Sequence, residues 1–133
     1  RLVAWEFAWQ NIQKSLFLGK GFFFDETLMR ANYSYLSRLG HEGAVHNTYL
    51  IIWLNTGLIG LIFFLRGFFL VFVSAAKKTK IAFPVMLTVM LTIMFEPWLA
   101  ASLNPFTILF LFIVTILNIE IQNENPRTNE IYA

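Results

Sequence analysis

The first polar and apolar pattern in the chain is a helical stripe within residues 2–18. Its bulky apolar side chains recur at spacings of four, three and four residues, and they are Trp5, Trp9, Ile12 and Leu16. This spacing places them on one face of an α-helix. The helix is too polar to span a membrane, and two Trp on one face suit a membrane–water interface. We therefore expect an amphipathic surface helix, or else the outer end of a transmembrane helix, ending at Gly19-Lys20-Gly21.

Residues 22–46 show no clear period and carry both signs of charge. Their charged side chains include Asp25, Glu26, Arg30, Arg38 and Glu42. Such a segment is too charged for hydrocarbon, so it is expected to lie in water or to line a polar cavity. Long connections without secondary structure are usually functional, and we expect the same here.

A long apolar run follows. From Asn47 to Arg66 the chain has 20 residues, which as a helix would cover about 30 Å, one hydrocarbon thickness. A helix that enters the membrane at Asn47 would bring Arg66 to the far interface, where its side chain can reach water. The apolar run continues to Ala76, so we expect a long, tilted helix.

Three lysines close this run, at Lys77, Lys78 and Lys80. A lysine cluster in a short loop marks the cytoplasmic side, which places residues 1–46 on the outer face. Two more apolar segments, 81–96 with Pro84 near its start and 104–119, predict two spans joined by an outer turn around Glu96–Pro105. A re-entrant dip is the alternative. The polar tail, 120–133, would then be cytoplasmic and loose.

Composition narrows the class of protein. Of 133 residues, 57% are hydrophobic, 17% aromatic and only 14% charged, whereas soluble domains are about a quarter charged. A chain this short has little interior in which to hide such an apolar excess. We therefore predict an all-α integral membrane protein, a fragment of a polytopic helical bundle. Residues 1–46 would form an outer-face loop with an amphipathic helix, residues 47–119 about three transmembrane helices (47–76, 81–96 and 104–119), and residues 120–133 a tail. Because the chain begins with Arg, we read it as the C-terminal part of a longer protein.

Several chemistries lack their sequence signals. The chain has no Cys, and therefore no thiol nucleophile or thiolate metal site. His41 and His46 are five residues apart with Gly43 between them, whereas the zinc-protease helix needs a spacing of four. No phosphate-binding glycine loop, nucleophile elbow or nucleic-acid patch is present. We expect no metal, no cofactor and no nucleic-acid partner.

The most informative motif is His46-Asn47, then nine residues, then Gly57-Leu58-Ile59-Gly60. It places two polar side chains at the outer mouth of a membrane helix. Gly57 and Gly60, about one turn apart, would let another helix approach closely. Intramembrane polar groups are often functional, although polar residues at a membrane mouth also serve as helix caps and interface anchors.

This motif resembles the signature of the bacterial O-antigen ligase and O-antigen polymerase family. Two further elements occur in family order. The first is similar to the upstream Arg, Trp and Gly-x-Gly element and consists of Arg1, Trp5 and Gly19-Lys20-Gly21. The second is similar to the downstream acidic-aromatic turn and consists of Phe95, Glu96, Trp98 and Leu99. The resemblance extends to about Phe112.

The resemblance implies a multi-pass glycosyltransferase of the bacterial inner membrane that uses a polyprenyl-diphosphate-linked glycan as donor. The acceptor would be another lipid-linked glycan for a polymerase, or lipid A–core for a ligase. The lipid bilayer is the remaining partner. The alternative is a non-enzymatic transporter or flippase segment, for which Pro84 and Glu96 are the only hints.

The residues suggest roles for this chemistry. Arg1 suits the diphosphate leaving group through its fork of donors, or else anchors the start of a helix. His46 can accept the proton of the attacking hydroxyl near neutral pH, or can donate to the diphosphate. Asn47 orients the histidine or caps the helix. Glu96 is a second base, an acceptor-binding group or an ordinary exposed carboxylate. Trp98 stacks on a sugar or belongs to the interfacial aromatic belt.

Overall fold

The computed structural model describes residues 1–41, 43–100 and 104–119. The secondary structure of these residues is all helical, which confirms the predicted all-α class. The elements are α1 (Leu2–Ile12), a 3-10 turn η1 (Gln13–Ser15), α2 (Phe24–Ala31), α3 (Tyr33–Arg38), α4 (Thr48–Ala76), α5 (Ala82–Phe95) and α6 (Pro105–Asn118). The expectations for Glu42 and for the tail fall outside the described residues.

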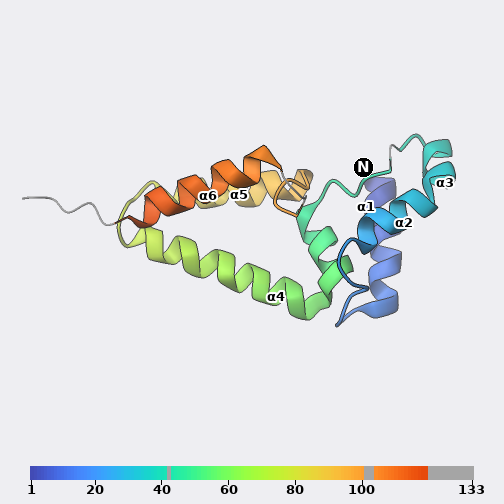
Figure 1. Ribbon diagram of the computed structural model, residues 1–133, viewed down its shortest axis with the longest axis horizontal. Coiled ribbons are helices and arrows are strands. Elements are labelled where there is room, and N and C mark those ends of the chain that lie inside the picture. The colour runs from blue at the N-terminus through green and yellow to red at the C-terminus, as the bar shows by residue number, and fades with distance from the viewer. Residues whose placement is uncertain (42, 101–103, 120–133) are drawn as a thin grey trace, which may run out of the picture.

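The helices form two parts, and α4 runs from one into the other (Figure 1). We call residues 1–56, with α1, α2, α3 and the first two turns of α4, the head. The arm holds the rest of α4, together with α5 and α6. Each part has its own apolar core. The buried residues are Ala4, Ala8, Met29, Leu36, Val45 and Ile51 in the head, and Phe68, Phe72, Met86, Val89 and Ile93 in the arm.

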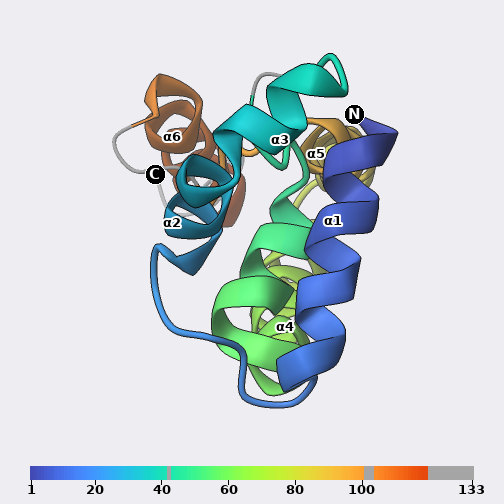
Figure 2. The same ribbon diagram turned by 90° about the vertical axis from the view of Figure 1, so that its right-hand side faces the viewer.

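Helix α1 lies along the first part of α4 (Figures 1 and 2). The predicted helix is present, but its buried face differs from the predicted stripe. The buried positions are Ala4, Ala8, Asn11 and Ile12, whereas Trp9 is 41% exposed and meets the ring of Trp53 edge-on at 5.3 Å. Small side chains allow the two helices to pack closely, so the bulky tryptophans flank the contact instead of filling it.

The segment expected to be a loop, 22–46, contains α2 and α3. Asp25 and Glu26 lie in the first turn of α2 and Arg30 in its last, an order that complements the helix dipole. Met29 and Leu36 are buried in the core of the head. The prediction of a connection without secondary structure is therefore wrong, because each helix is too short to show a clear apolar period.

Helix α4 is broken at Gly57. Its φ of 72° and ψ of −176° are not helical, and glycine reaches this conformation without the strain that a Cβ would add. A Cβ at Gly57 would also collide with the carbonyl of Phe17. Because the chain after α1 passes directly across the break, α4 changes direction there (Figure 1).

The crossing segment, Leu16–Gly21, satisfies the backbone groups that the break exposes. The N–H groups of Lys20 and Gly21 donate to the carbonyls of Leu54 (3.0 Å) and Asn55 (2.8 Å). On the other side, Leu58 N–H donates to the Leu16 carbonyl at 2.9 Å and Ile59 N–H to that of Phe17 at 3.3 Å. Helix ends leave such groups without intrahelical partners. The break is therefore held by four backbone hydrogen bonds.

By length and composition, α4 alone among the described helices could cross a membrane. Helices α5 and α6 have 14 residues each, about 21 Å, which is shorter than the roughly 30 Å of hydrocarbon. Of the three predicted spans, α4 is thus the one that its length and composition support. After the break, α4 runs from Leu58 to Ala76, about 28 Å. Arg66 lies near the middle of this continuous segment, not at its end.

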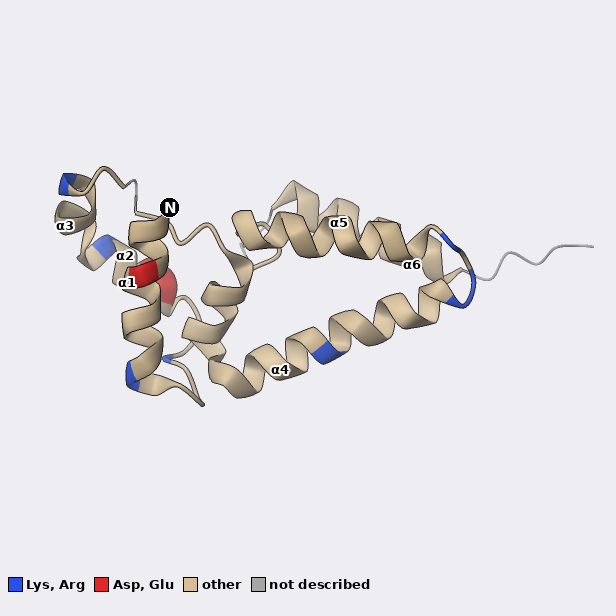
Figure 3. Ribbon diagram, turned by 180° about the vertical axis from the view of Figure 1, so that it is seen from behind, with Lys and Arg blue, Asp and Glu red and all other residues tan. Residues whose placement is uncertain are grey.

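Most charged residues lie either in the head or in one basic turn (Figure 3). The basic turn that contains Lys77, Lys78 and Lys80 lies between α4 and α5, at the end of the arm remote from the head. The head holds the acidic residues of α1 and α2 together with basic residues, among them Arg30 and Arg38. The predicted cytoplasmic side rests on the basic turn alone.

Candidate functional site

Three of the residues singled out in the sequence meet where the head joins the arm. Arg1 precedes α1, His46 precedes α4, and Glu96 follows α5. The Arg1 guanidinium donates through Nη2 to Glu96 Oε1 at 3.1 Å and through Nη1 to the Phe95 carbonyl at 3.0 Å. Both side chains of this ion pair are about half exposed. Arg1 and Glu96, 95 positions apart in the sequence, thereby form one solvent-accessible polar cluster.

Neighbouring contacts fix this junction. The Thr48 hydroxyl donates to the Glu96 carbonyl at 2.9 Å, and the Trp5 indole N–H donates to the Val45 carbonyl at 2.9 Å. The rings of Trp5 and Phe95 lie 6.2 Å apart. The start of α1, the start of α4 and the end of α5 are therefore linked to one another beside the cluster.

His46 is held in an unusual backbone conformation. Its φ of 45° lies in the left-handed region, which non-glycine residues rarely adopt and which often marks functional sites. Its Nδ1 is buried, makes no hydrogen bond within the described residues, and lies 3.8 Å from Glu96 Oε2. That distance is too long for a hydrogen bond, but catalytic hydrogen bonds often tighten only when substrate is bound. The side chain is one-third exposed, so the imidazole is reachable.

Asn47 acts as the N-cap of α4. Its side-chain oxygen accepts a hydrogen bond from Leu50 N–H at 3.0 Å, and the residue is buried. Capping by Asn satisfies an otherwise free helix N–H. Of the two roles considered from the sequence, the structure shows the cap.

Trp98 does not join the cluster. Its ring packs edge-on against Phe110 of α6 at 5.7 Å, in the core of the arm. Together with Glu96 it borders an apolar cavity of about 390 Å³ between α5 and α6. The side chain therefore faces the core of the arm.

The two motif glycines have different surroundings. Gly57 admits a close approach, but the approaching backbone is that of Phe17 and Leu18, which lies outside any helix. At Gly60 the nearest atoms belong to Thr56 of the same helix, whose hydroxyl donates to the Ile52 carbonyl at 2.7 Å. Close contact with another helix is thus found at neither glycine within the described residues.

The sequence analysis missed one polar pair. The Asn55 amide donates to Asp25 Oδ1 at 2.8 Å, and its oxygen accepts from the Asp25 N–H at 3.1 Å. This two-way contact fastens the start of α2 to the broken part of α4. The available signal was Asn55 itself, a polar residue in an otherwise apolar run two positions before Gly57.

Over the stretches that the structure describes, no three His, Asp or Glu side chains gather in a way that could hold a metal ion. The cluster instead offers one guanidinium, one imidazole and one carboxylate. Such a set can bind an anion, accept a proton and stabilise the resulting imidazolium.

Comparison with known proteins finds one family. The family described as O-antigen ligase matches residues 1–65 of the chain. The match confirms the resemblance drawn from the sequence, and it includes Arg1, His46, Asn47 and both motif glycines, while Glu96 lies beyond it. No curated protein and no solved structure matches the chain.

Proposed function

We propose that this chain carries the reaction site of a membrane glycosyltransferase of the O-antigen ligase or polymerase type. The donor would be a glycan linked to polyprenyl diphosphate, and the site would face outward from a bacterial inner membrane. The observation that carries the proposal is the convergence of Arg1, His46 and Glu96 from three separate parts of the chain. The family match supplies the class of reaction.

Arg1 is proposed to bind the diphosphate. Its guanidinium already presents two N–H groups toward oxygen atoms, those of Phe95 and Glu96. The same fork can engage two phosphate oxygens at once, which an ammonium group cannot do. Because the side chain is half exposed, an entering diphosphate can share it, and the positive charge stabilises the negative charge that develops on the leaving group.

His46 is proposed as the proton acceptor. In the reaction, the acceptor hydroxyl oxygen forms a bond to the anomeric carbon while the bond from that carbon to the diphosphate oxygen breaks. The diphosphate leaves with the electron pair, and the hydroxyl proton moves to His46 Nε2. Glu96 faces the other ring nitrogen at 3.8 Å, where a carboxylate would orient the ring and stabilise the imidazolium.

The orientation of the site is proposed from the charges. The basic turn at Lys77–Lys80 lies at the far end of the arm from the head, and lysine-rich loops stay in the cytoplasm. Cysteines introduced at Ser37 and Thr79 should then react differently with an impermeant thiol reagent in intact cells, with labelling only at position 37. Labelling only at position 79 would place the site on the cytoplasmic face and contradict the proposed orientation.

The function is tested by removing the gene of the whole protein and analysing the surface glycan on a gel. Loss of long chains with single units retained identifies a polymerase, and loss of all glycan from lipid A–core identifies a ligase. Re-expression should restore the pattern. An unchanged pattern after deletion, or loss of glycan export with lipid-linked chains of full length accumulating inside, would contradict the proposed transferase and favour a transporter.

A further inference from the structure

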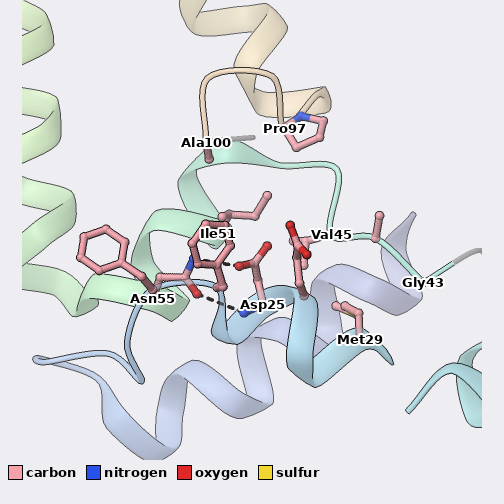
Figure 4. A pocket seen from close by; sticks show the side chains of 12 residues that line it. Asp25, Met29, Gly43, Val45, Ile51, Asn55, Pro97 and Ala100 are labelled. Atoms are coloured by element: carbon pink, nitrogen blue, oxygen red, sulfur yellow. Dashed lines mark hydrogen bonds between the residues drawn. The ribbon is translucent and has the colours of Figure 1, made fainter. Parts of the chain in front are cut away.

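A cavity of about 230 Å³ lies beside the proposed reaction site (Figure 4). Its walls come from α2, from the segment that leads into His46, from the first part of α4 and from the turn that follows Glu96. Val45 and Pro97 both line it, and they are the chain neighbours of His46 and Glu96. A molecule held in this cavity would therefore lie directly beside the proposed proton acceptor.

The lining combines carboxylates with apolar surface. Asp25 and Glu26 supply the acidic groups, Asn55 an amide, and Met29 and Ile51 buried apolar side chains. Carboxylates accept hydrogen bonds from hydroxyl groups, while apolar side chains can cover the C–H faces of a sugar ring. Ligand sites of this kind are concave and mostly apolar, with a few polar groups that set orientation.

One of the two carboxylates, that of Asp25, is held in place before any ligand enters. Asn55 binds both the backbone N–H and the carboxylate of Asp25, as the dashed lines in Figure 4 show. A carboxylate fixed in this way loses little freedom on binding, which favours affinity. The contact that fastens α2 to α4 thus also orients the cavity's acidic group.

The cavity differs in charge from the site proposed for the diphosphate at Arg1. Among the described residues, no Lys or Arg lines the cavity. Arg30 lies 3.8 Å from Glu26 Oε2, but its side chain is 85% exposed and outside the lining, so the cavity itself presents carboxylates, which disfavour a phosphate group. Arg1 precedes α1, and Figure 2 shows α1 and α2 on opposite sides of the first part of α4. In an inverting displacement at the anomeric carbon, the acceptor approaches from the side opposite the leaving group.

We propose that this cavity binds the terminal sugar of the acceptor glycan, with Asp25 and Glu26 accepting hydrogen bonds from its hydroxyl groups. The inference rests on the proposed transferase function and assigns the second substrate of that site. The expected ligand is an unphosphorylated sugar, since the charged groups that line the cavity are the carboxylates of Asp25 and Glu26. The donor's diphosphate remains with Arg1.

The test uses the full-length protein in detergent and the variants Asp25→Asn and Glu26→Gln, alone and combined. Both substitutions keep the shape of the side chain, and position 25 keeps its backbone N–H for Asn55. Glu6→Gln, on an exposed position of α1 that does not line the cavity, is the matched control. Thermal stability of each variant checks that the fold is retained.

Transfer is measured with a labelled polyprenyl-diphosphate-linked repeat unit as donor, while lipid A–core or the repeat unit itself is titrated as acceptor. We expect the KM for acceptor to rise about tenfold for each lost charged hydrogen-bond partner, with the KM for donor within twofold of wild type. An unchanged acceptor KM would overturn the proposal. A rise in the KM for donor alone would also overturn the proposal, because it would assign the cavity to the donor's sugar.

A binding measurement separates this inference from the proposed function. Saturation-transfer NMR with the delipidated core oligosaccharide or repeat-unit glycan needs no turnover. The wild type should show transfer to one of these sugars, and the double variant should lose it. Binding without any glycosyl transfer would contradict the proposed function and leave the cavity assignment standing, whereas absence of binding to the wild type would overturn the cavity assignment.

Discussion

The head and the arm are built by different interactions. In the head, segments far apart in sequence are joined by backbone and side-chain hydrogen bonds, above all where Leu16–Gly21 crosses the break at Gly57. In the arm, the core is aromatic, with the ring of Phe68 5.0 Å from that of Phe72 and 6.0 Å from that of Phe110. In the head, directional hydrogen bonds therefore fix how the segments lie relative to one another. In the arm, apolar packing holds the helices together. The proposed site lies where the two meet.

The family match covers the two parts unequally. It ends at residue 65, so it covers the head and only the beginning of the arm. The head contributes Arg1 and His46, whereas Glu96 comes from the arm. Damage to the break that joins the head should therefore lower stability and disturb the site together, whereas damage to the aromatic core of the arm, away from Glu96, should lower stability while the geometry persists.

The largest effect on stability is expected from Gly57→Ala. Alanine would be strained at a φ of 72°, at a cost of about 1–3 kcal/mol. Its Cβ would also displace the segment whose four hydrogen bonds contribute about 1 kcal/mol each. We expect a large loss of folded protein, measured as abundance and melting temperature in detergent.

Gly67→Ala is the matched control, because nothing lies near a Cβ at that position and its φ is ordinary. Alanine also favours helix over glycine by roughly 1 kcal/mol. Equal stability of the two variants would mean that the break in α4 does not hold the head together.

In the arm, Phe72→Ala should reduce stability without altering the site. Phe72 is 2% exposed, and truncating a buried Phe typically costs about 3–5 kcal/mol. The remaining folded protein should keep its activity per molecule, measured as transfer rate against the amount of folded protein. A large fall in activity per molecule would show that the arm sets the geometry of the site as well.

Arg1→Lys should affect activity and leave stability almost unchanged. Lysine keeps the charge but loses the fork that can bind two oxygens, so we expect at least about a tenfold lower transfer rate, since bonds to charged groups contribute roughly 1.5–3 kcal/mol. Arg38→Lys, at an exposed position of α3, serves as control. A normal rate for the Arg1 variant would reduce Arg1 to a structural anchor.

The positions of the long helices follow from the sequence alone. Apolar runs bounded by charges or proline predict 47–76, 81–96 and 104–119, and the structure has α4, α5 and α6 within one residue of these limits. The break in α4 does not follow, because a single glycine in an apolar run is ordinary. Its need for a positive φ arises only from the crossing segment, a contact that no local pattern encodes.

The site was predictable only in part. The family resemblance pointed to Arg1, His46 and Glu96, but their contact depends on how α1 and α5 meet α4. The resemblance groups Trp98 with them because its acidic-aromatic element contains both Glu96 and Trp98, yet the ring of Trp98 packs on Phe110 in the arm. The buried face of α1 was misjudged for a related reason, since close helix packing selected Ala4 and Ala8 over the larger tryptophans.

The central claim is that His46 accepts the proton of the attacking hydroxyl. The most direct test is the initial rate of glycan transfer per mole of folded full-length protein carrying His46→Ala. General acid–base residues contribute about 10²–10⁴-fold, so the rate should fall by that factor. The protein should accumulate normally, because the side chain is partly exposed and its loss removes little apolar contact. A wild-type rate from normally accumulated His46→Ala protein would contradict the catalytic assignment.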